Sequence, residues 1–313
     1  MIPFLSEIIN AVVIGSLYSL MALPLTLSYR IVKFPNFAHT FLITMGAYAG
    51  IAISMLFPTN VFVLIPVAFI VGAMAAVANH LLVYAPLMKR EATPLTLMIA
   101  SLGSSIFLKY ILYSIIGLVW RVWKVELYYA IPNVPMGEPF RIGDFYLNQI
   151  FVLSVVIAIA LVVGLQIFLL KFKIGRAIRA VADNADLAEL SGISKDRMMV
   201  VMWVIAGGVA AVAGLFWCFF TRATPEMGDA VILSVFASSV IGGLQSFLGT
   251  IAGSYIIASA ENVLIAGLHS LVGLDVSFRP FISFLTLVVV LLVRPPAGVS
   301  LTAQAIFARR KRA

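Results

Sequence analysis

Long apolar runs separated by short polar stretches dominate the pattern of the chain from one end to the other. A helix needs about 20 mostly apolar residues to cross a bilayer. The pattern predicts nine membrane-spanning segments: Ile8–Ser28, Phe37–Phe57, Val61–Val83, Pro94–Val119, Gln149–Leu170, Met199–Phe220, Val231–Gly267 divided into two, and Pro280–Val293. We therefore expect one transmembrane domain over residues 1–313, an all-α polytopic membrane protein with about 8–10 helices, some of them short or interrupted.

One segment in this set is too short to span a membrane as a regular helix. Val231–Ile241 covers only about half of a ~30 Å hydrocarbon core at 1.5 Å per residue. It ends at Gly242 and Gly243, and we interpret it as a half-helix or re-entrant segment. Because interrupted helices often border a transport pathway, Gly242, Gly243 and the nearby Gln245 are candidate gate residues.

A weak similarity links residues 36–50 with residues 228–243. Each stretch has a polar opening, an apolar run of small residues and a glycine at its end. Transporters often contain internal repeats of this kind, so the similarity suggests a duplicated unit.

Composition and charge support a membrane protein and give it an orientation. The chain is 62% hydrophobic and 11% charged, against about 25% charged residues in soluble domains. If the polar loop 171–198 is cytoplasmic, fifteen of the 21 Lys and Arg residues fall in cytoplasmic segments and five outside, as the positive-inside rule requires. The N-terminus and the loop 120–148 then lie outside. Basic residues at span ends do not form a nucleic-acid-binding face.

The loop 171–198 is the one long segment of mixed charge between spans, and it has helical signals of its own. Gly175–Ala182 reads as one short helix, and Asp183 or Asn184 can cap a second one. Gly192 suits its left-handed end. A helix this short is marginal in water, so it must pack on something. From the pattern alone, a cytoplasmic ATPase and the bilayer surface are equally good candidates.

Polar residues within or next to the spans form three candidate groups. Asn36 and His39 share a helical face and can line the pathway or a gate; alternatively, Asn36 caps a helix and His39 is a hydrogen-bonded core residue. Lys109 and Glu261 lie deepest in spans, where charge is costly, so we expect them to pair with each other or to contact a polar solute. The outer carboxylates, which either meet a solute-binding protein or are simply solvated, are Glu226 and Asp229.

Enzyme motifs and cofactor motifs are missing from the sequence. There is no GxxxxGK[ST] phosphate loop, no HExxH and no GxSxG, so the chain has no recognisable means of hydrolysing ATP or of binding zinc. With Cys218 as the single cysteine, an intrachain disulfide and a cysteine metal cluster are excluded. We expect no catalytic residue, metal or cofactor.

Four blocks of sequence resemble the branched-chain amino-acid ABC permease family, which includes related urea permeases. The blocks are INAVVIGSLYSLMALPLTLSYRIVKFPNFAHTFLITMGAY, GRAIRAVADNADLAELSGISKDR, VIGGLQSFLGTIAGSYIIASAENV and LLVRPPAGV, in family order. The second block resembles the loop that couples such permeases to their ATPases. The resemblance implies these ATPase-coupling residues: Arg176, Arg179, Asp183, Asp186, Leu187, Glu189, Leu190 and Gly192.

The resemblance also implies partners and a mechanism. Such a permease works in the prokaryotic cell membrane with a second, homologous permease, two cytoplasmic ATPase subunits and an extracytoplasmic solute-binding protein, and it transports by alternating access. Family residues differ here at Thr40-Phe41, Gln245 and Leu248, which leaves urea, amides and small carboxylates open beside branched-chain amino acids. The competing class is an ion-coupled secondary transporter, for which Glu261 is nearly the only candidate coupling carboxylate.

Overall fold

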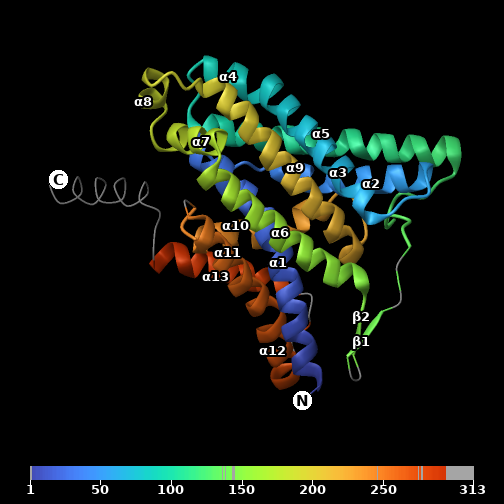
Figure 1. The fold of residues 1–313 in the computed structure, drawn as a ribbon. Helices are drawn as coiled ribbons and strands as arrows, with labels where there is room; N and C mark the ends of the chain where they lie inside the picture. Colours follow the sequence, from blue (N-terminus) through green and yellow to red (C-terminus); the bar gives the residue numbers. More distant parts are fainter. Residues whose placement is uncertain are drawn as a thin grey trace, which may run out of the picture.

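A computed structural model describes residues 2–293 apart from 136, 138, 143–144, 245, 274 and 276–277. The elements within these residues are α1 Ile2–Val32, α2 His39–Leu56, α3 Val61–Asn79, η1 His80–Tyr84, α4 Ala85–Lys89, α5 Pro94–Trp123, β1 Phe140–Ile142, β2 Phe145–Leu147, α6 Gln149–Lys171, α7 Lys173–Asp183, α8 Ala185–Leu190, α9 Lys195–Thr221, α10 Met227–Ile241, α11 Phe247–Ser259, η2 Ala260–Leu264, α12 Ile265–Val272 and α13 Arg279–Val293. Figure 1 shows their arrangement.

The expected all-α polytopic architecture is confirmed. Seven helices in the described part of the chain are long and apolar enough to cross a membrane, and the shorter apolar helices Met227–Ile241 and Arg279–Leu292 add two. The segment that reads as too short on sequence, α10, has 15 residues, or roughly 22 Å of rise. Among the described residues, β-pairing is limited to the short antiparallel pair β1–β2 and an isolated bridge between Ala130 and Ala223.

Two of the spans contain a π-helical turn. The turn η1 lies between α3 and α4, and the turn η2 lies between α11 and α12, with no break in either helix. Each π-helical turn inserts an extra residue into the helical repeat and is often found at functional sites. Both turns carry buried polar side chains, namely His80 and Tyr84 in η1, and Glu261 and Asn262 in η2.

The spans form two halves whose first helices make matching contacts with the opposite half. We call α1–α5 the first half and α9–α13 the second half. Helix α1 packs on α11 and α10 of the second half, while α9 packs on α3 and α2 of the first. The end of α1 lies at α7, where Arg30 pairs with Asp183, and α9 starts at the same end of the molecule after α8, so α1 and α9 run in opposite directions (Figure 1). This exchange of partners agrees with the sequence similarity between residues 36–50 and 228–243.

Glycines allow the closest helix contacts in the core. A Cβ atom at Gly46 would overlap the carbonyl of Ala211, and one at Gly214 would overlap the carbonyl of Ile43, so α2 and α9 touch backbone to backbone. Gly72 on α3 and Gly207 on α9 meet in the same way. Small residues at such crossings increase van der Waals contact between helices in a membrane, and α9 is accordingly buried along most of its length.

Candidate functional site

The loop 171–198 contains the two short helices that its sequence indicates. Asn184 is the cap of α8, since its side chain accepts a hydrogen bond of 3.0 Å from the backbone N–H of Leu187. Asp186 lies in the first turn, and the chain leaves the helix through Gly192 at φ +81°. The residues predicted to start and stop this helix therefore do so.

In the same loop, α7 packs against the membrane spans, whereas α8 exposes apolar side chains. Helix α7 buries Ile178 and Val181. The guanidinium of Arg30 at the end of α1 lies 3.2 Å from the carboxylate of Asp183. On α8, in contrast, the side chains of Leu187 and Leu190 are 61% and 87% exposed. Figure 1 places α7 and α8 at the opposite end of the molecule from the N-terminus and α12.

Other members of the predicted coupling set differ in their exposure. Arg176, Asp186 and Glu189 are exposed, whereas Arg179 is half-buried and its buried Nε has no hydrogen-bond partner. An apolar pair of leucines ringed by charges is the usual make-up of a surface that meets another protein.

Asn36 and His39 are buried, and the side chain of each makes a hydrogen bond within the bundle. The hydroxyl of Tyr84 in η1 donates to Asn36 Oδ1 over 2.7 Å and accepts from Asn79 over 2.9 Å. Its ring lies 5.3 Å from that of Trp203 on α9. His39 Nε2 lies 2.8 Å from the backbone carbonyl of Met21. These contacts are those of a hydrogen-bonded core, and a pathway or gate role for Asn36 and His39 stays a prediction.

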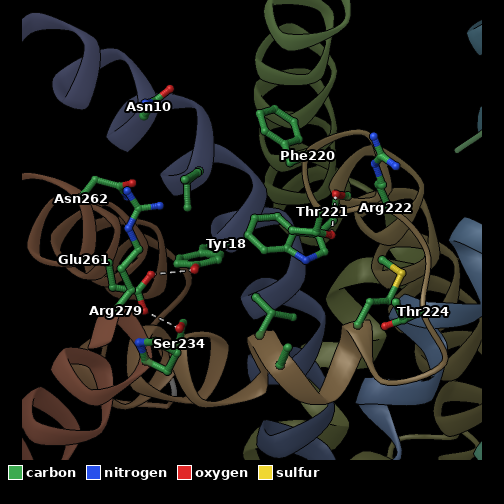
Figure 2. A pocket seen from close by; sticks show the side chains of 16 residues that line it. Asn10, Tyr18, Phe220, Thr221, Arg222, Thr224, Ser234, Glu261, Asn262 and Arg279 are labelled. Carbon is green, nitrogen blue, oxygen red and sulfur yellow. Dashed lines mark hydrogen bonds between the residues drawn. The ribbon is translucent and has the colours of Figure 1, made fainter. Parts of the chain in front are cut away.

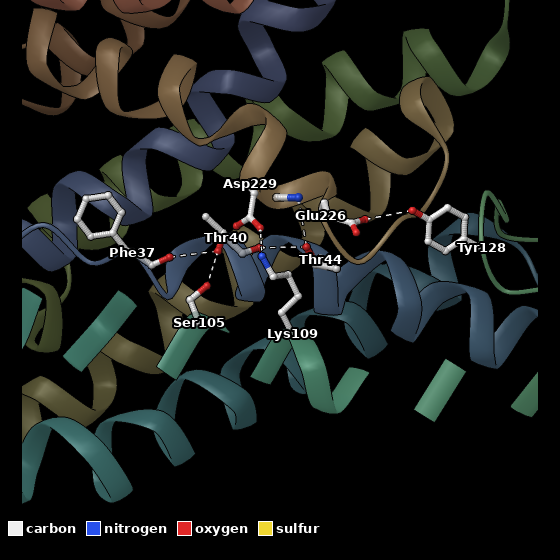
Figure 3. A network of polar contacts seen from close by, with 9 residues as sticks. Phe37, Thr40, Thr44, Ser105, Lys109, Tyr128, Glu226 and Asp229 are labelled. Carbon is white, nitrogen blue, oxygen red and sulfur yellow. Dashed lines mark hydrogen bonds and ion pairs between the residues drawn. The ribbon is translucent and has the colours of Figure 1, made fainter. Parts of the chain in front are cut away.

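The hypothesis that Lys109 pairs with Glu261 is wrong. Lys109 Nζ on α5 lies 2.6 Å from the carboxylate of Asp229 in the first turn of α10 (Figure 3). This pair joins the two halves, and it is partly shielded from solvent at 22% and 37% side-chain exposure. The sequence predicts Asp229 as an outer carboxylate, but α10 starts two residues before it, and Asp229 faces α5 from the first turn of this helix.

The same region contains hydroxyl contacts between neighbouring spans. Thr40 Oγ1 lies 2.7 Å from Ser105 Oγ, and the N–H of Gly228 donates to Thr44 Oγ1 over 3.2 Å (Figure 3). Glu226 accepts a bond of 3.4 Å from the hydroxyl of Tyr128 in the outer loop. Of the two outer carboxylates, only Asp229 is held in an ion pair.

The turn between α10 and α11 is tightly folded. Gly243 and Leu244 both have positive φ angles, and Gly242 packs directly on Gly249. Gln245 lies outside the described residues. The contacts explain why glycine occupies position 242, and a gating role for Gly242 and Gly243 stays a prediction.

Glu261 in η2 is buried at 4% exposure and collects three hydroxyl groups from three helices. Tyr18 of α1 donates to its Oε2 over 2.7 Å, and Ser234 of α10 donates to its Oε1 over 2.5 Å. Ser283 of α13 also donates to Oε1. Hydrogen bonds to an ionised carboxylate are the strong ones, so these three donors stabilise a negative charge between the helices of the second half and α1.

A cavity of about 600 Å³ opens beside Glu261, and we call it the outer cavity. Its polar side carries Glu261, Asn262 and Arg279, while aromatic residues from the end of α9 lie across from them (Figure 2). Every helix end around it belongs to the face of the molecule away from α7 and α8. The volume lies within the range of about 300–1,000 Å³ typical of small-molecule sites.

Of the residues singled out on sequence, only Glu261 lines this cavity. Sequence reasoning missed Tyr18 and Asn262 because each stands alone in an apolar run, although a polar residue directly after Glu261 is a signal for Asn262. On sequence, Arg279 is one of the five basic residues that fall on the outer side. The structure makes it the first residue of α13 and places it in the cavity wall.

The fold and these sites define a class. A bundle of membrane spans with a buried charge next to an outer cavity, and with an exposed helical loop at its other end, is a multi-pass transport protein of the cell membrane. The narrower assignment comes from sequence comparison. Residues 7–293 match the family described as the branched-chain amino acid transport system permease component, and the chain belongs to this family.

Several relatives match along almost the whole chain. The chain is 32% identical to the probable branched-chain amino acid transport permease LivH of Methanocaldococcus jannaschii, over 91% of this chain and 89% of the relative. It is 30% identical to the high-affinity branched-chain amino acid permease LivH of Escherichia coli, over 93% and 94%. BraD of Pseudomonas aeruginosa is 28% identical over the same shares. No solved structure matches the chain.

Proposed function

We propose that this permease imports branched-chain amino acids, driven by ATP that separate cytoplasmic subunits hydrolyse. The observation that carries the proposal is the match to LivH and BraD permeases over at least nine-tenths of this chain. The sequence has no GxxxxGK[ST] phosphate loop, which supports ATP binding on a partner rather than on this chain.

The partners follow from the same reading. A solute-binding protein delivers the amino acid at the outer face, two ATPase subunits act inside, and a second homologous permease completes the pathway. We assign Glu226 and Asp229 to the docking surface for the binding protein; Asp229 is held in place by its ion pair with Lys109. Asn36, His39, Gly242, Gly243 and Gln245 are proposed as parts of the path or gate.

Helix α8 is the proposed contact with the ATPase. Full burial of one leucine side chain contributes about 1.5–3 kcal/mol, and α8 offers Leu187 and Leu190 exposed. A movement of α8 reaches the spans by two routes: α7 is tied to α1 through Arg30 and Asp183, and α8 leads directly into α9. ATP-driven closure of the two ATPase subunits would thereby move α1 and α9 together.

The test replaces the apolar contact of α8 with charge. In proteoliposomes containing the whole transporter, Leu190→Asp should reduce leucine-stimulated ATPase activity at least about ten-fold, as expected when burial of a large apolar side chain is replaced by a desolvated charge. Leu190→Met, which keeps the apolar contact, is the matched control. Membrane insertion is checked by expression level and size-exclusion profile. Unchanged coupling in a normally inserted Leu190→Asp variant would refute the proposed role of α8.

One observation favours a second candidate, an ion-coupled secondary transporter. Glu261 is a buried carboxylate between spans, and such groups often couple ion movement to transport. Uptake that needs an ion gradient but neither ATP nor the ATPase subunits would select this alternative. The same vesicles, supplied with leucine, urea or an amide in turn, identify the solute.

A further inference from the structure

Glu261 forms no ion pair with any residue that the structure describes. Its three hydrogen-bond donors are neutral hydroxyl groups. A carboxylate has about four acceptor positions, so one remains beside the outer cavity. Because an uncompensated charge between spans is costly and marks a functional site by default, the cavity is suited to a ligand that brings a positive charge.

Two further polar atoms at the same wall are unsatisfied. Asn262 is 1% exposed, its NH₂ group donates to the carbonyl of Ala258, and its buried Oδ1 has no partner. Arg279 has a buried Nε without a partner, although its Nη2 lies 3.8 Å from a carboxylate oxygen of Glu7. The wall thus offers two acceptors, Glu261 and Asn262 Oδ1, next to one donor of a guanidinium (Figure 2).

The remaining lining is mixed, because the polar residues Asn10, Thr221, Arg222 and Thr224 stand beside a group of apolar ones. The apolar residues are Ile14 of α1, Trp217 and Phe220 of α9, and Met227 and Val231 of α10. Sites for small molecules commonly combine such an apolar lining with a few placed polar groups that fix orientation. A ligand here meets two acceptors and the guanidinium of Arg279 at one end, and across from them an aliphatic and aromatic surface that also carries Thr221 and Arg222 (Figure 2).

We propose that the outer cavity binds the zwitterionic head of an α-amino acid, with Glu261 and Asn262 holding the ammonium group, Arg279 holding the carboxylate, and the apolar wall receiving a branched aliphatic side chain. This deepens the proposed function, on which the choice of an amino acid rests. The cavity of one subunit then checks the solute before it enters the shared pathway. Tyr18, Ser234 and Ser283 are positioning residues that fix the carboxylate of Glu261.

Cysteine protection measures occupancy of the cavity without the binding protein. Thr224, which lines the cavity, is replaced in a Thr224→Cys variant of the whole transporter in lipid nanodiscs, and a charged methanethiosulfonate reagent modifies the new thiol. The wild-type chain is the background control, because its single Cys218 is buried. We expect millimolar L-leucine to slow modification. L-leucinamide lacks the carboxylate and 4-methylpentanoate lacks the ammonium group, so each should need a concentration about 10–100-fold higher.

Matched variants test which protein side chain binds each charged group of the amino acid. Adding Glu261→Gln to Thr224→Cys should abolish protection by L-leucine, whereas adding Glu126→Gln, the same change at an exposed residue of the outer loop, should leave it intact. Arg279→Gln tests the other end of the ligand and should weaken protection by L-leucine without weakening that by L-leucinamide. If Glu261→Gln does not assemble, the comparison of the three solutes on Thr224→Cys still decides.

Two results would overturn the site: no protection by L-leucine, or equal protection by all three solutes. The failure of the site is separable from that of the proposed function. Normal ATP-driven leucine uptake by the wild-type transporter, together with no protection, refutes only the cavity. Absence of ATP-driven leucine uptake refutes the proposed function itself.

Discussion

Helices α1 and α9 hold corresponding places in the two antiparallel halves, yet different contacts hold them. Helix α9 meets α2 and α3 through glycine and alanine backbone, as at Gly214 against the carbonyl of Ile43. Helix α1 meets α11 and α10 through hydroxyl groups: Thr26 bonds Thr250 over 2.9 Å, and Ser239 donates to the carbonyl of Ala22 over 3.3 Å. We call the contact of α9 with α2 and α3 the steric interface, and the contact of α1 with α10 and α11, in which Gly15 also approaches Tyr255, the polar interface.

The difference indicates which interface can move. Backbones in direct contact cannot shift without a clash or a void, because packed interiors do not deform continuously. A hydroxyl pair can exchange its partner for water at small cost, and the outer cavity lies beside this polar interface. We therefore expect α2, α3 and α9 to move as one body, and the contacts of α1 with α10 and α11 to rearrange during transport.

The largest expected effect is at the steric interface. Gly214→Leu places a side chain into the carbonyl of Ile43, which no rotamer of leucine avoids. We expect a loss of stability above about 3 kcal/mol, beyond the usual range for overpacking, and hence a collapse of the monodisperse fraction in size-exclusion chromatography. Gly164→Leu is the matched control, since Gly164 on α6 has nothing near its Cβ position. Equal yields of the two variants would contradict a rigid α2–α9 contact.

A smaller effect is expected at the ion pair that joins the halves. Lys109→Met and Asp229→Asn should each lower stability by about 1–2 kcal/mol, at the low end for charge-assisted bonds because both side chains are partly exposed. Thermal melting of the purified protein measures this. Arg121→Met, an exposed cation on the same helix, is the control.

The exchanged pair Lys109→Asp with Asp229→Lys tests the assignment of partners. It should melt above either single reversal, since the two charges again meet between α5 and α10. A double variant no more stable than the single ones would show that the pair does not hold the halves together.

The smallest effect is expected at the polar interface. Thr26→Val removes one hydroxyl contact with Thr250 and should cost about 0.6 kcal/mol, the average for hydrogen bonds between membrane helices. A double-mutant cycle with Thr250→Val isolates the pair by its change in melting temperature. A coupling above about 2 kcal/mol would mean that this interface is as rigid as the steric one, and the contrast between α1 and α9 would then fail.

Features that depend on local sequence were predictable, and those that depend on how the helices pack together were not. The spans follow from apolar length, and α8 follows from Asn184 and Gly192, because a cap and a left-handed stop act over a few residues. The partner of Lys109 was mistaken because Asp229 and Glu261 both offer a carboxylate, and only the position of α5 against α10 selects Asp229.

The outer cavity was hidden for the same reason. Glu261 stood out as a charge within a span, but Tyr18, Ser234 and Ser283 reach it from three other helices. No sequence spacing relates residues so far apart. The π-helical turns η1 and η2 were also missed, since the stretches 80–84 and 260–264 contain neither Gly nor Pro to mark a change in the helix.

Helix α6 has a role that depends on whether the number of membrane crossings is odd or even, and not on its particular side chains. In the described part of the chain, four long apolar helices precede it, and two long ones together with the shorter apolar helices α10 and α13 follow it. A unit of four crossings returns the chain to its starting side, so two such units joined directly would be inserted into the membrane in the same orientation. One additional crossing turns the second unit upside down. Any sufficiently apolar helix meets that requirement during biosynthesis, which fits the low burial of α6, and the exchange of partners between α1 and α9 depends on it.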